Sequence, residues 1–133
     1  MNAIARLAHA IGYPEEIPAG VAAHVLTVEG RPVEAREEGD RLVLVSTLAE
    51  EPDEALLVRF AGYAAGRLLK EEAVLAWDPR TSSLILWQGV PATSSDDVLR
   101  RFLEVFATSC EWWLARLREE ESATQIPEMV IRP

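Results

Sequence analysis

Few residues in this chain have the type and spacing that catalysis requires, which is a set of titratable side chains that converge. His9 lies opposite the apolar positions of a predicted helix and His24 lies at the start of a predicted strand, and neither has a metal-ligand partner at suitable spacing. Cys110 lies within an apolar helix stripe, where a thiol acts as a small buried hydrophobe. Asp96 and Asp97 fall at a predicted helix start, where carboxylates serve as caps. An enzyme is therefore the least favoured class, and we expect neither catalytic residues nor a metal.

The composition indicates one compact acidic domain. The chain has 133 residues, and 49% of them are hydrophobic, which is enough to fill a core. Asp and Glu number 22 against 13 Lys and Arg, and the net charge of −9 opposes binding to nucleic-acid phosphates. No Gly-rich phosphate-binding fingerprint occurs, so no cofactor is expected.

Localisation is predicted from the absence of export signals. No run approaches the roughly 18 apolar residues of a membrane span, so no membrane insertion is expected. The start, MNAIARLAHAIG, is too short and too polar for a secretory signal. A single cysteine allows no internal disulfide, which fits a reducing compartment. We expect a cytoplasmic protein.

The first half of the chain predicts a short helix followed by an antiparallel meander. Residues 2–12 have an amphipathic helical pattern with Asn2 as the cap. Residues 24–30, 31–40 and 41–49 have strand patterns, and glycine-containing turns separate them. The middle strand alternates apolar and charged residues, so one of its faces is expected to contact water.

The second half predicts a helix over residues 50–72 with Asp53 as its cap, then a hairpin, then a long helix over residues 94–121. The two hairpin strands, residues 73–77 and 83–88, are apolar on both faces. The order α-β-β-β-α-β-β-α predicts an α+β fold with a twisted antiparallel sheet and three helices. We expect a single domain over residues 1–122 and a flexible C-terminal tail over residues 123–133.

The second predicted helix contains two glycines, although each interior glycine costs a helix about 1 kcal/mol relative to alanine. On a helical wheel, one narrow face lined with small residues lies apart from the sheet-facing side. This face comprises Ala55, Gly62, Gly66 and Leu69. One interpretation is a dimer seam, in which a partner's backbone approaches closely and also covers the hairpin that carries Trp77 and Trp87. The other is packing of the glycines against a loop or the sheet of the same chain.

Trp112 lies off the main apolar stripe of the last helix, with Val98 and Val105 at seven-residue spacing behind it. A broad core-facing helix surface accounts for this pattern. The alternative is a surface groove for a partner, because aromatic residues anchor interfaces.

The stretch LAWDPRTSSLILWQGVPATSSDDVLRRFLEVFATSCEWWLARL combines a strand, a D-P turn, an apolar strand and a long helix with an aromatic pair. Together with the small size, the acidic balance and the element order, this stretch resembles the class I type III secretion chaperones, the Tir chaperone family. The resemblance covers nearly all of residues 1–122.

The resemblance implies a bacterial, cytoplasmic, non-enzymatic homodimer. Such a protein binds the N-terminal segment of a secreted effector protein and keeps it soluble, partly unfolded and competent for export. It implies dimerisation through the second helix and the adjoining strand. The effector-binding residues that it implies lie on the first helix and the sheet, and they are Ile4, Leu7, Ala8, Ile11, Val25, Val28, Leu42 and Leu44. A second function class stays open, which is a small dimeric ligand-binding or regulatory domain of the same shape with an internal apolar pocket.

Overall fold

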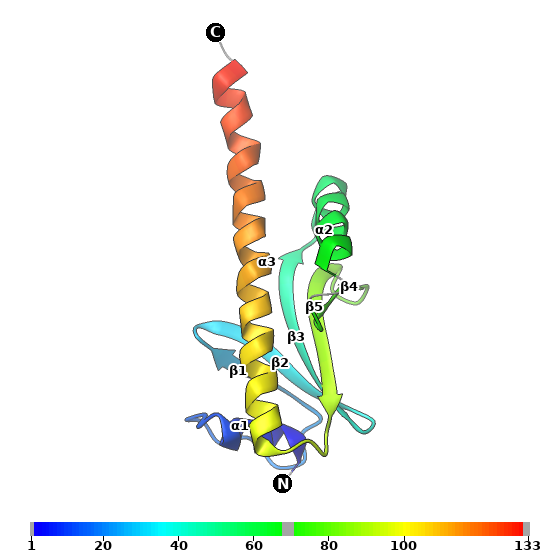
Figure 1. The fold of residues 1–133 in the computed structure, drawn as a ribbon, viewed down its shortest axis with the longest axis vertical. Coiled ribbons are helices and arrows are strands. Elements are labelled where there is room, and N and C mark those ends of the chain that lie inside the picture. Colours follow the sequence, from blue (N-terminus) through cyan, green and yellow to red (C-terminus); the bar gives the residue numbers. More distant parts are fainter. Residues whose placement is uncertain (1, 68–70, 132–133) are drawn as a thin grey trace.

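The computed structural model describes residues 2–67 and 71–131, with side chains as far as Glu119. In these residues the order is α-β-β-β-α-β-β-α, as the sequence predicts. The strands form one antiparallel sheet in the order β1-β2-β3-β5-β4. Helices α1 and α3 both contact the sheet, and α3 lies across β3 and β5 (Figure 1). The predicted α+β architecture is confirmed.

Helix α1 (Ala3–Ala10) begins where the sequence predicts. The side chain of Asn2 accepts a hydrogen bond from the Ala5 amide at 2.9 Å, which satisfies one of the free amides of the first turn. The helix ends at Ala10, and Gly12 then takes a φ of 68°, which residues with a side chain rarely adopt. The chain therefore turns sharply away from the helix at this point.

Strands β1 (Ala23–Val28), β2 (Arg31–Glu38) and β3 (Arg41–Glu50) form the predicted meander. Glu29 and Gly30 both have positive φ, 52° and 79°, as a two-residue type I′ hairpin turn requires. Val33 and Ala35 of β2 are buried, whereas Glu34 and Arg36 are partly exposed on the opposite face. The wet face predicted for the middle strand is thus confirmed.

Helix α2 (Glu54–Arg67) is capped by Asp53, whose carboxylate accepts a hydrogen bond from the Leu56 amide at 2.8 Å. Strands β4 (Val74–Asp78) and β5 (Ser83–Pro91) form the predicted hairpin at the other end of the sheet. Because both faces of β5 are apolar, its residues divide between two clusters. Leu84 and Leu86 join the main core, and Ile85 joins Val43 and Val45 on the opposite face.

Helix α3 (Asp96–Ile131) supplies Trp113, Phe102 and Phe106, which are buried aromatic side chains of the core. Its buried stripe comprises Leu99, Phe102, Leu103, Phe106, Cys110 and Trp113. The Trp113 ring packs on Phe60 of α2 at 5.4 Å, and its indole N–H donates to the Glu71 carboxylate at 3.2 Å. These contacts fix α2 and the segment before β4 against α3.

The end of α3 differs from the prediction. A loose tail is expected from Ala123, but the helix continues to Ile131 and extends well past the sheet (Figure 1). The physical reason is local, because residues 118–126 are rich in Glu, Arg, Ala and Gln, which favour helix.

Candidate binding groove

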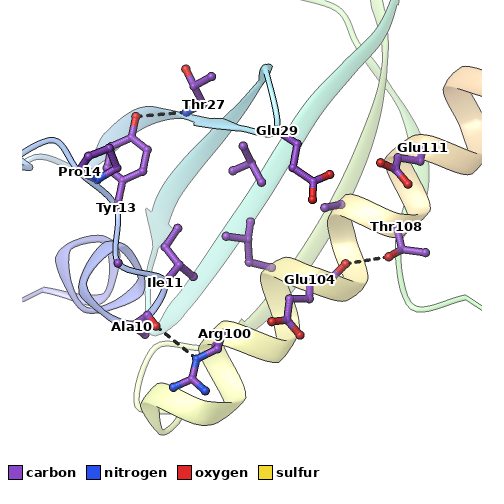
Figure 2. Close-up of a pocket in the computed structure, with 14 residues that line it drawn as sticks. Ala10, Ile11, Tyr13, Pro14, Thr27, Glu29, Arg100, Glu104, Thr108 and Glu111 are labelled. Carbon is purple, nitrogen blue, oxygen red and sulfur yellow. Dashed lines mark hydrogen bonds between the residues drawn. The ribbon is translucent and has the colours of Figure 1, made fainter.

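A groove of about 530 Å³ lies between the end of α1, the end of β1 and the first half of α3 (Figure 2). Ile11, Val28, Leu103 and Ala107 supply its apolar surface. Side chains of Glu29, Arg100, Glu104, Thr108 and Glu111 supply polar groups around that surface. The groove therefore has a floor with a small apolar area, surrounded by polar and charged groups, and an amphipathic chain segment has side chains of both kinds to place on it.

The turn after α1 builds one wall of the groove. The Tyr13 amide donates to the Ala8 carbonyl at 2.9 Å, which carries the tyrosine ring over towards β1. The Thr27 amide donates to the Tyr13 hydroxyl at 3.2 Å (Figure 2). On the opposite side, the Arg100 guanidinium donates to the Ala10 carbonyl at 3.2 Å and ties α3 to the end of α1. Both walls are thus held by specific contacts, and the groove is preformed.

Strand β1 lies at the edge of the sheet, beside the groove. Val28 and Arg31 close the two-residue turn and form a hydrogen-bonded pair. Because hydrogen-bonded pairs alternate along an antiparallel ladder, the residues of β1 whose backbone bonds to β2 are Val28, Leu26 and His24. The bond from the Glu37 amide to the Ala22 carbonyl continues the same alternation. The backbone groups of Ala23, Val25 and Thr27 therefore point outward from the sheet, and the Tyr13 hydroxyl caps the amide of Thr27.

The predicted effector-binding residues divide into two groups. Ile11 and Val28 line the groove, and Val25 is 51% exposed on β1. The others are buried in the core of the single chain, with at most 5% of their surface exposed: Ile4, Leu7, Ala8, Leu42 and Leu44. Their placement gives these five a packing role, and only the first group offers surface to a bound segment.

Residues of the groove that the sequence analysis did not single out come from three separate elements. Tyr13 follows α1, Thr27 belongs to β1, and Leu103, Glu104 and Ala107 belong to α3. Tyr13 immediately precedes a proline, which favours an extended backbone there, but no pattern in the sequence places its ring beside β1. The other residues become neighbours only through tertiary packing.

The glycines of α2 do not pack inside the chain. A methyl group added at Gly62 or Gly66 would meet no atom within 4 Å, which excludes packing against a loop or the sheet among the described residues. The exposed side of α2 carries six small or apolar residues and two charged ones, and it comprises Glu54, Ala55, Val58, Arg59, Ala61, Gly62, Ala65 and Gly66. Trp77 on β4 is 46% exposed, and Trp87 packs partly buried on the second apolar cluster. Leu69 lies outside the described residues.

Trp112 packs onto the core from its edge. Its ring meets Tyr63 of α2 edge-on at 6.2 Å, and the guanidinium of Arg67 lies 3.8 Å from the ring centre. Core packing is therefore the better interpretation of Trp112, while Val98 and Val105 behind it are 47% and 42% exposed.

The remaining titratable groups form no reactive cluster in the described part of the chain. Cys110 is 2% exposed, as predicted, and burial raises the pKa of its thiol. Among residues 2–67 and 71–131, no three His, Cys, Asp or Glu side chains are grouped to hold a metal ion. Within the same residues, no helix has the length and apolar character needed to span a bilayer.

Comparison with known proteins gives one family and a set of similar folds. The model of the Tir chaperone protein (CesT) family matches residues 2–114. No curated protein sequence matches the chain. A chain of the HopA1–SchA chaperone–effector complex is 16% identical, with a TM-score of 0.65, and the match covers 84% of this chain and 89% of that one.

Two further solved structures have the same fold. A chain of the ExoT–SpcS complex from Pseudomonas aeruginosa is 19% identical, with a TM-score of 0.62 and coverage of 83% of this chain and 92% of that one. YbjN, a putative transcription regulator from E. coli, is 13% identical, with a TM-score of 0.63 and coverage of 88% and 90%. At these identities the structures establish the fold, and the family match carries the functional information.

Proposed function

We propose that this chain, which belongs to the Tir chaperone protein (CesT) family, binds the N-terminal segment of a secreted effector in the groove beside β1. The family is one of type III secretion chaperones, and the proposal specifies which surface of this chain holds the effector. The effector segment is called the client below. Binding keeps the client extended, soluble and competent for export. We place this activity in the bacterial cytoplasm, and the proposal involves no catalytic step.

The observation that supports this proposal is a groove with both apolar and polar lining beside an open strand edge. An extended client can pair its backbone with the outward groups of Ala23 and Val25 and place alternate side chains over Ile11 and Val28. Main-chain hydrogen bonds contribute affinity for any extended sequence, and apolar contacts select among sequences. Because the groove is preformed, most of the ordering cost of binding falls on the client.

Dimerisation through α2 is the second part of the proposal. Most residues on the exposed side of α2 are small or apolar, Val58 there is 66% exposed, and Arg59 adds one charged side chain between Ala55 and Gly62. Small residues allow a second helix to approach closely, and a two-fold axis repeats each contact, so a short helix can supply an adequate interface. Ala55, Gly62 and Gly66 would form the centre of this interface, with Trp77 beside it.

The test of strand pairing uses proline at an outward position. Val25→Pro removes an amide that points away from β2, so the sheet keeps its internal hydrogen bonds, as proline on an edge strand allows. Val25→Thr is the matched control, because it retains the amide and the β-branched shape. Each protein is immobilised and exposed to lysate of the native host, and bound proteins are identified by mass spectrometry.

We expect one dominant bound protein, whose purified N-terminal fragment rebinds the wild-type chain and the Val25→Thr variant. Val25→Pro is expected to weaken rebinding at least about tenfold, while its melting temperature stays close to that of Val25→Thr. Equal binding of the N-terminal fragment by both variants would rule out pairing at β1. Rebinding only by other parts of the captured protein would contradict the proposed function.

A further inference from the structure

The rim of the groove carries more negative than positive charge. Glu29 lies in the turn after β1, Glu104 lies on α3, and Glu111 lies one helical turn beyond Thr108 (Figure 2). Arg100 is the cation among the lining residues. The groove therefore repeats locally the acidic balance of the whole chain, whose net charge is −9.

Two of these carboxylates have no ion-pair partner among the described residues. Glu111 pairs with Arg31 at 3.2 Å, and Arg100 pairs with Asp97 at 3.1 Å. Glu29 and Glu104 make no such contact within the described chain, and both are exposed. They come from different sides of the apolar floor, one from the β1–β2 turn and the other from α3. A cation bound between them would meet carboxylates from both sides.

If the client is extended, the side chains on one face of its strand would contact both the groove floor and the carboxylates of Glu29 and Glu104. Side chains two residues apart in a strand share a face and lie about 6.7 Å apart. Lysine and arginine can lay their aliphatic stems on an apolar surface while the charged end reaches a carboxylate. An apolar residue over Val28 and Leu103 would thus place a basic residue two positions away near Glu29 or Glu104.

We propose that the groove selects client segments in which an apolar residue and a lysine or arginine lie two positions apart. This inference rests on the proposed function, because it specifies the chemistry of the client at the same groove. It adds a charge requirement to a surface that would otherwise accept any extended apolar segment.

The experiment compares three synthetic fluorescein-labelled peptides with the same apolar residues. The positions two away from each apolar residue hold lysine in the first peptide, glutamine in the second and glutamate in the third. Affinities are measured by fluorescence anisotropy with the wild-type chain, with Glu29→Gln/Glu104→Gln, and with Glu50→Gln/Glu51→Gln. The last variant is the matched control, because it removes two charges at exposed residues outside the groove.

We expect the wild-type chain to bind the lysine peptide about threefold to tenfold more tightly than the glutamine peptide, and the glutamate peptide most weakly. The preference should disappear in Glu29→Gln/Glu104→Gln and persist in Glu50→Gln/Glu51→Gln. It should shrink at about 1 M salt, where the screening length falls to roughly 3 Å.

Equal affinities for the three peptides would overturn the charge requirement and leave the groove and the proposed function standing. If the preference for the lysine peptide persisted in Glu29→Gln/Glu104→Gln, the preference would come from the overall charge of the chain. That result would also overturn the inference. Failure of all three peptides to bind would contradict the groove as the client site, and with it the proposed function.

Discussion

At the scale of single residues, the structure separates side chains that pack in the core from side chains that stay exposed. Leu7 and Val25 are both aliphatic, and the family resemblance implies that both contact the effector. Leu7 is fully buried between α1, the sheet and α3, whereas half of Val25 is exposed on the edge strand. Burial of a leucine side chain stabilises a fold by about 1.5–3 kcal/mol, so the two residues should differ in their effect on stability.

Leu7→Ala is expected to lower the free energy of unfolding by about 2–5 kcal/mol, because it leaves a cavity in the core. Val25→Ala should change it by no more than about 0.5 kcal/mol. Thermal and urea denaturation of the two variants measure this directly. If Leu7→Ala left the stability unchanged but weakened client binding, Leu7 would belong to the binding surface after all.

At the scale of elements, α2 has a core-facing side around Phe60 and an exposed side on which small residues surround Arg59. Phe60 packs into the core, whereas a methyl group added at Gly62 or Gly66 would meet no atom within 4 Å in the described chain. In an isolated chain, an exposed glycine in a helix lowers stability relative to alanine and makes no compensating contact. The proposed interface gives Gly62 and Gly66 a physical reason, because a second backbone could approach them closely.

Substitutions of different size at these glycines test the seam. Gly62→Ala/Gly66→Ala should raise intrinsic helix stability by about 0.5–1 kcal/mol per site and allow dimers to form, since a methyl group is small. Gly62→Leu/Gly66→Leu should shift the chain to monomer at micromolar concentration because the larger side chains separate the two helices. Light scattering coupled to size-exclusion chromatography gives the mass of each variant. A stable dimer of the leucine variant would remove the glycines from the interface.

Much of the element pattern could be predicted from the sequence, because its signals are local. Asn2 and Asp53 cap their helices as predicted, and Gly30 supplies the turn that the hairpin needs. The burial of the stripe on α1 could not be predicted, because an amphipathic pattern does not tell whether its apolar side meets the same chain or a partner. The sequence analysis ended the last helix at residue 121 and expected a flexible tail from residue 123, whereas α3 continues to Ile131.

The groove was only partly predictable. Ile11 and Val28 carry the apolar signal that the sequence analysis used, and both line the groove. Tyr13 and Thr27 are 14 positions apart, and Glu29 and Glu104 lie on different elements, so no spacing rule joins either pair. Their proximity depends on where α3 crosses the sheet, which only the packed core determines.

At the scale of the whole molecule, the proposed function uses three separate surfaces. The groove and the β1 edge receive the client, the exposed side of α2 joins two copies, and the net charge of −9 keeps a complex with exposed apolar segments in solution. In a two-fold dimer each copy contributes its own groove, so a long client could be held at two places at once. The fold alone does not imply this use, because YbjN has a similar structure.

Amide hydrogen exchange of the chain with and without the captured N-terminal fragment tests the central claim most directly. The outward amides of Ala23 and Val25 have no partner in β2, so they should exchange rapidly in the free protein. Strand pairing with the client should slow both on the order of tenfold or more, and Leu26, already bonded to β2, should change far less. Fast exchange at Ala23 and Val25 in a fully bound complex would contradict the account, because the client would then be held without pairing to β1.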